Sequence, residues 1–172
     1  MTARRVYFAS AVVLLALLLQ LTLLARLGLP GATPDLLLVV VVALAIAYGP
    51  LEGMLIGFFA GLTADLIPPA DHALGRFAFV ICLVGYLAGR VRGEAARSAL
   101  GSVLFVAMAA VGAAVIGGGL AEAMGEADGL RRSVLQLLPT AVLYDVVLAP
   151  FVVPTVIRLA NRIEPAAGTY AI

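Results

Sequence analysis

The sequence predicts an all-α integral membrane protein built as a six-transmembrane-helix bundle. Hydrophobic residues make up 63% of the 172 residues and charged residues only 12%, whereas soluble domains carry about 25% charge. The mean hydropathy is +1.13, and the length allows roughly six spans of about 20 residues each. We therefore expect a single transmembrane domain over residues 1–172, with no room for a separate soluble catalytic domain.

The expected spans follow the apolar runs of the sequence. The first run follows the basic pair Arg4-Arg5 and is longer than the apolar core of a secretory signal, so we expect it to be retained. Pro34-Asp35 precedes the second span, and Gly49-Pro50 separates the second from the third, as in a tight helical hairpin. The expected spans are about 6–25, 35–48, 51–67, 77–91, 98–120 and 133–157.

The lengths of these runs set expectations for their arrangement. The second to fourth runs fall below the roughly 20 residues that cross a bilayer. We expect them to be central in the bundle, flanked by longer helices, or to thin the bilayer locally. The run Gly117-Gly118-Gly119 is interpreted as the end of the fifth span.

Arginine placement predicts the orientation, because loops on the cytoplasmic side carry an excess of basic residues. With six spans and the N-terminus inside, more arginines lie in the cytoplasm than outside, which favours cytoplasmic N- and C-termini. The inner set is Arg4, Arg5, Arg90, Arg92, Arg97, Arg158 and Arg162, and the outer set is Arg26, Arg76, Arg131 and Arg132.

The residue types that are missing exclude much chemistry. All 11 basic residues are arginine, which excludes a Walker-type phosphate loop, a Schiff-base lysine and a pyridoxal site. His72 is the only histidine and Cys82 the only cysteine, so a metal site with three or four clustered ligands is not expected. A net charge of +1 gives no attraction to nucleic acid. We expect no catalytic residue, no cofactor and no metal.

Two glycine stripes mark helix faces. Small residues four positions apart let another helix approach closely, and such patterns usually serve packing within one protein. Two stripes suggest two close contacts, made either inside the bundle or with a separate membrane partner. The first stripe is Gly53, Gly57 and Gly61, and the second is Gly85, Gly89 and Gly93.

Two aspartates lie within the expected spans. Asp65, near the outer end of the third span, is either a helix-end residue or a buried acceptor that fixes a helix pair or binds a partner. Asp145 lies in the middle of the sixth span, where an acidic residue costs about 2.5 to 3.5 kcal/mol. A donor on another helix, a water-filled cavity or protonation must compensate. Pro139 and Pro150 predict a kink near Asp145. Its role is structural anchoring or a partner or ligand site.

An intramembrane aspartyl protease is a third reading of these aspartates. Two carboxylates that share a proton lie about 3 Å apart, whereas the expected depths of Asp65 and Asp145 differ by roughly 10 to 15 Å. Lipoprotein signal peptidases also place asparagines beside their aspartates, and Asn161 is the only asparagine here. The protease is therefore disfavoured. His72, beside Asp71 in an expected outer loop, is interpreted as a loop residue.

Over about residues 30–95 the chain resembles the rod shape-determining MreD family. The resemblance rests on Pro34-Asp35-Leu36, on GPLEGMLIGFFAGLTADL with its glycines and Asp65, and on GYLAGRVRG. It implies a multi-pass protein of the bacterial inner (cytoplasmic) membrane, similar in fold to the substrate-binding subunits of energy-coupling-factor transporters. It also implies a non-enzymatic role in rod-shape maintenance and lateral peptidoglycan synthesis. The implied partners are MreC and, indirectly, RodA, the elongation penicillin-binding protein and MreB.

The residues and the resemblance both indicate a scaffold among membrane lipids. The chain has few polar groups in its spans and no assembled nucleophile, which suits a protein that organises other membrane helices. The alternative is a small-molecule-binding membrane transporter subunit, which needs a pocket with several convergent polar groups. The polar residues that could rim such an outward pocket are Thr63, Asp65, Asp71, His72, Glu122 and Glu126.

Overall fold

The computed structural model describes residues 2–26, 31, 33–67, 74–91, 99–125 and 131–163. These residues form six α-helices and no strand. Three stretches within them, Ala3–Thr22, Leu100–Ala123 and Val134–Ile163, are long and apolar enough to cross a membrane. The prediction of an all-α membrane protein is confirmed. The helices are α1 (Ala3–Thr22), α2 (Leu36–Tyr48), α3 (Pro50–Leu66), α4 (Arg76–Arg90), α6 (Ala99–Ala123) and α8 (Leu138–Ile163).

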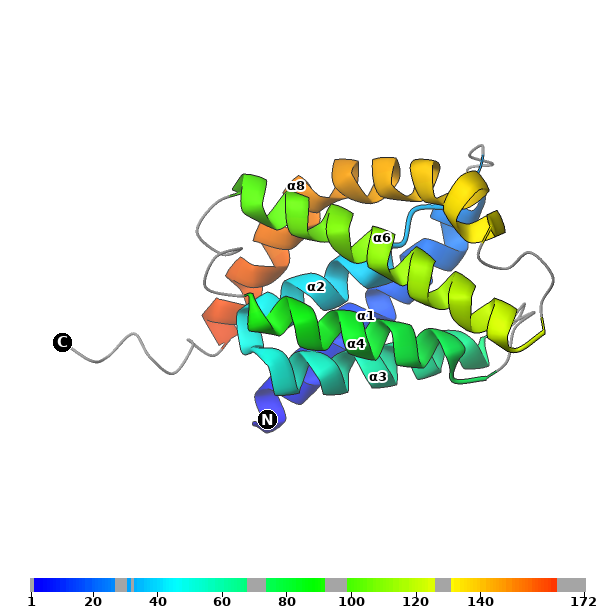
Figure 1. The fold of residues 1–172 in the computed structure, drawn as a ribbon. Coiled ribbons are helices and arrows are strands. Elements are labelled where there is room, and N and C mark those ends of the chain that lie inside the picture. Colours follow the sequence, from blue (N-terminus) through cyan, green and yellow to red (C-terminus); the bar gives the residue numbers. More distant parts are fainter. Residues whose placement is uncertain are drawn as a thin grey trace.

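Helix α2 is the centre of the bundle, and all 13 of its residues are buried. Figure 1 shows it between the other helices, and it contacts α1, α3, α4, α6 and α8. Its sequence is apolar on every side, which suits a helix that is surrounded by protein. At about 20 Å it is too short to match the hydrocarbon core. Because α2 is surrounded by protein, its length does not need to match the thickness of the hydrocarbon core. Helix α2 therefore fits the expectation of a central short helix.

Helices α3 and α4 pack against each other along the two glycine stripes. A Cβ atom added at Gly53 would lie 2.6 Å from the carbonyl oxygen of Gly85, and one at Gly57 would overlap the carbonyl oxygen of Ile81. The two backbones are therefore in direct contact, and the two stripes face each other. Gly53 also lies against Ala45 of α2. Gly93 lies outside the described residues. The remaining close approaches are Gly61 with Ala78 and Gly89 with Pro50.

The outer faces of α3 and α4 carry large exposed side chains. Phe59 is 62% exposed and Phe79 is 53% exposed. Of the two alternatives expected for the short helices, a central position therefore does not apply to α3 and α4, and local thinning of the bilayer stays a prediction for them. The glycine contact gives each of them one buried face, and the opposite face is exposed at the surface of the bundle.

Helix α6 continues past the glycine run that was interpreted as its end. The helix includes Gly117-Gly118-Gly119 and ends at Ala123. The positive φ that helix-terminating glycines often adopt occurs only later, at Gly125 (φ 93°). In hydrocarbon an unbroken helix keeps its backbone groups bonded, which explains why the glycines stay helical.

Helix α8 also continues past the expected end of its span at residue 157 and ends at Ile163. Pro150 and Pro154 lie inside it, and Figure 1 shows that α8 changes direction between its orange and its red-orange parts. Proline is the usual cause of such bends, because it removes a backbone donor and crowds the preceding turn.

An ion pair joins α1 to the turn between α2 and α3. Arg5 binds Glu52 at 3.1 Å, and its guanidinium lies 5.2 Å from the centre of the Tyr48 ring. The turn itself depends on Gly49, whose φ is 104°, followed by Pro50 at the first position of α3. The start of α1, the end of α2 and the start of α3 therefore lie together, and we call this region the Arg5 end.

We predict that Gly57→Ala lowers the free energy of unfolding by about 1 to 3 kcal/mol, the usual cost of overpacking. The new methyl group would meet backbone atoms of Ile81 and Cys82, which cannot swing aside as a side chain can. Gly112→Ala is the matched control, because a Cβ there has no heavy atom within 4 Å. The measurement is thermal unfolding of the detergent-solubilised chain by circular dichroism. Equal melting temperatures for the two variants would contradict the glycine contact.

Candidate functional site

Three side chains gather at the buried N-terminus of α2. They are Gln20 from α1, Asp35 at the start of α2 and Asp145 from α8, and we call them the α2 cap cluster. The first backbone N–H groups of a helix have no partner within that helix. Buried in an apolar bundle, these donors need acceptors from elsewhere in the chain.

Each member of the α2 cap cluster accepts one backbone hydrogen bond. Asp35 Oδ1 accepts from the N–H of Leu38 at 3.0 Å, and Gln20 Oε1 accepts from the N–H of Leu37 at 3.0 Å. Asp145 Oδ1 accepts from the N–H of Asp35 at 2.8 Å. The cluster therefore ties α1 and α8 to the central helix.

Asp145 is only 1% exposed. Of the compensations considered for it, the structure supplies a donor from another element, which is the backbone N–H of Asp35. The positive end of the α2 dipole adds to this, because a helix N-terminus favours acidic groups. The geometry thus gives Asp145 an anchoring contact, while a partner or ligand role for it stays a prediction.

Asp65 also accepts hydrogen bonds from the first backbone N–H groups of a helix, in this case α4. It is 3% exposed, and its Oδ2 accepts from the N–H of Gly75 at 2.8 Å and from that of Ala78 at 3.1 Å. Gly75 is the N-cap residue of α4 and has no side chain to cap the helix itself. A carboxylate from α3 therefore caps α4 and joins the two helices near the end of their glycine contact.

The structure does not bring Asp65 and Asp145 into one hydrogen-bonded group. Asp65 binds the start of α4, and Asp145 binds the start of α2. The acidic residue near Asp145 is Asp35, which the sequence analysis treated only as the boundary of a span. Among the described residues, no group of three or more His, Cys, Asp or Glu side chains is placed to hold a metal ion.

Sequence reasoning missed Asp35 and Gln20 as members of the site. An acidic residue directly before an apolar run is a common N-cap pattern, so Asp35 carried a readable signal. Gln20 is the one glutamine within the first span, and an amide inside a span usually has a bonding partner on another helix. Neither signal identifies Asp145 as the third member.

The polar residues considered for a transporter pocket do not form one pocket in the described part of the chain. Asp65 is engaged in capping α4, and Glu122 is exposed on α6. Asp71, His72 and Glu126 lie outside the described residues.

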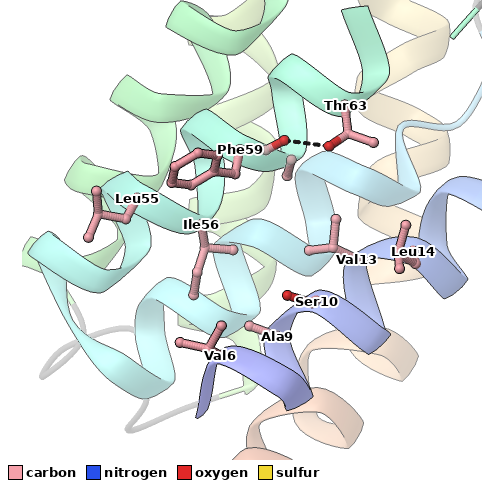
Figure 2. A pocket seen from close by; sticks show the side chains of 10 residues that line it. Val6, Ala9, Ser10, Val13, Leu14, Leu55, Ile56, Phe59 and Thr63 are labelled. Carbon is pink, nitrogen blue, oxygen red and sulfur yellow. Dashed lines mark hydrogen bonds between the residues drawn. The ribbon is translucent and has the colours of Figure 1, made fainter. Parts of the chain in front are cut away.

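A groove of about 450 Å³ lies between α1 and α3 (Figure 2), and we call it the α1–α3 groove. Its floor is made of buried residues and its rim of exposed ones. Thr63 Oγ1 donates to the backbone oxygen of Phe59 at 2.7 Å, so this hydroxyl is satisfied within its own helix. The lining residues are Val6, Ala9, Ser10, Val13, Leu14, Leu55, Ile56, Phe59, Ala60 and Thr63.

Comparison with known proteins places the chain within a family. The family model described as rod shape-determining protein MreD matches residues 3–163. No curated protein and no solved structure matches the chain. The expected likeness to energy-coupling-factor subunits therefore stays an expectation.

We predict that Asp145→Leu lowers the free energy of unfolding by about 1 to 3 kcal/mol, because it leaves the part-buried N–H of Asp35 without its acceptor. Asp145→Asn keeps a carbonyl oxygen of nearly the same shape and should retain most of the stability. The measurement is thermal unfolding of both variants in the same detergent. If the Asn variant is as unstable as the Leu variant, the acceptor is not what Asp145 contributes.

Proposed function

Because the chain belongs to the rod shape-determining protein MreD family, we propose that it is a non-enzymatic scaffold of the bacterial cell-elongation machinery. The match over residues 3–163 carries this proposal, and it extends the resemblance seen over residues 30–95 to most of the chain. The family indicates a role in determining rod shape. A scaffold performs that role by holding other membrane proteins together.

The hydrogen bonds of the aspartate side chains support the proposal of a scaffold. Asp35, Asp65 and Asp145 each accept backbone hydrogen bonds at a helix start. Such contacts fix the arrangement of the helices. The carboxyl oxygens that accept these hydrogen bonds therefore serve the fold. A rigid bundle with defined outer faces is what a membrane scaffold needs, because helices in lipid associate through close packing.

We further propose that the protein lies in the inner membrane as a six-span bundle with both termini in the cytoplasm. The Arg5 end would then be the cytoplasmic end, as the excess of arginines there favours. The proposed direct partner is MreC. Through MreC the protein would support RodA, the elongation penicillin-binding protein and MreB in lateral peptidoglycan synthesis.

We predict that the tagged chain, co-expressed with the MreC protein of the same genome, recovers MreC from detergent-solubilised membranes. A tagged single-span protein of unrelated function, expressed at the same level, should recover at least about tenfold less. The readout is quantitative immunoblotting after size-exclusion chromatography. If the chain elutes as a monodisperse bundle without MreC, the scaffold proposal fails for this partner.

Depletion of the chain should turn rod-shaped cells of its source into rounded ones. The physical reason is that wall synthesis along the sides of the cell loses its membrane organiser. The measurement is the ratio of length to width by light microscopy, with re-expression of the chain as the control. Cells that keep their rod shape after depletion would contradict the role in lateral growth.

A further inference from the structure

The α2 cap cluster brings two carboxyl groups to the start of one helix. Asp145 Oδ1 accepts from the backbone N–H of Asp35 at 2.8 Å. The Asp35 carboxyl group is attached to the same residue as that nitrogen, so the two carboxyl groups are near neighbours. We propose that the α2 cap cluster is a proton-binding site, in which Asp145 holds one proton when the chain is folded at neutral pH.

Two ionised carboxylates at this place would repel each other. Burial strengthens the repulsion, because the interior of a protein screens charge less than water does. Asp145 is only 1% exposed, and the hydrogen bond that it accepts comes from a backbone N–H group, which carries no net charge. A buried carboxylate that lacks a cationic partner usually takes up a proton and becomes neutral.

No cationic side chain in the described part of the chain forms an ion pair with either aspartate. Helix α8 packs against α1, α2, α6 and the short π-helix that precedes it. The arginines of α1, Arg4 and Arg5, lie at the Arg5 end, far from the α2 cap cluster. Helix α6 brings the exposed Glu122, and α2 brings Asp35 itself. Both of these groups are acidic.

The arginines before and after Asp145 along the chain are also distant. Arg132, at the start of the π-helix Arg132–Leu137, and Arg158 on α8 each lie about 13 residues from Asp145, or roughly 20 Å along a helix. This separation is much longer than an ion pair. The adjacent Tyr144 brings no positive charge. A proton is therefore the positive charge that this part of the bundle can supply to Asp145.

The observed hydrogen bonds are compatible with one proton on Asp145. A protonated carboxyl group keeps an oxygen that can accept from the N–H of Asp35. Asp35 is the better place for the remaining negative charge, because it is less buried than Asp145 and accepts from the N–H of Leu38 at the positive end of the α2 dipole. Loss of the proton would add a second charge and weaken the attachment of α8 to α2.

The direct test is infrared spectroscopy of the full chain at pH 7, in a detergent without ester groups. We expect the carbonyl band of a protonated carboxyl group, and we expect Asp145→Asn to remove it. Asp65→Asn alters the other buried helix cap and is the matched control, which should keep the band. The inference is overturned if the unmodified chain shows no such band, or if the band survives in Asp145→Asn.

The pH dependence of stability is a second measurement. Unfolding exposes Asp145 to water, where an aspartate is ionised above about pH 4. Folding then takes up one proton, so the folding equilibrium constant should fall by up to about tenfold for each unit of rising pH while the folded chain keeps that proton. Asp145→Asn has nearly the shape of the protonated form and should show a shallower dependence, smaller by the contribution of one proton.

The comparison uses reversible unfolding of both variants in the same detergent, between about pH 5 and pH 7. Equal pH dependence in the two variants would contradict the proton site. Neither measurement involves a partner protein, so these outcomes are independent of the scaffold proposal.

Discussion

The constraint on which the structure depends is that a helix beginning inside an apolar bundle must find acceptors for its first backbone N–H groups. Helix α2 begins in this way, and Gln20, Asp35 and Asp145 supply the acceptors. The cost of burying the carboxyl group of Asp145 is offset by the N–H of Asp35 and by the helix dipole that it faces. Two outer helices are thereby fixed to the central one.

The same principle explains the pairing of α3 and α4. Their glycines bring the backbones together, and Asp65 caps the start of α4 from within α3. Since the polar contact and the close packing lie on the same pair of helices, they stabilise the same arrangement. The pair therefore behaves as one structural unit at the side of α2.

Much of the fold could be predicted from the sequence, because composition alone separates lipid-facing helices from a soluble core. The glycine spacing predicted a close helix contact. The spacing identifies a flat helix face, but it does not identify the helix that packs against that face. The need of Asp145 for a compensating donor was also predictable. Its donor lies 110 residues away in the sequence, at Asp35, and no local pattern reveals such a contact. The glycine run of α6 was misread because helix ends depend on backbone angles that composition does not set.

Helix α1 is held at two separated points. Near its start Arg5 binds Glu52, and near its end Gln20 accepts from the N–H of Leu37. The stretch between these two attachments forms one wall of the α1–α3 groove. Because α1 is attached to neighbouring elements near both of its ends, these contacts hold it at a fixed distance from α3 and so set the width of the groove. A surface that is already ordered lowers the entropic cost of binding for whatever packs there.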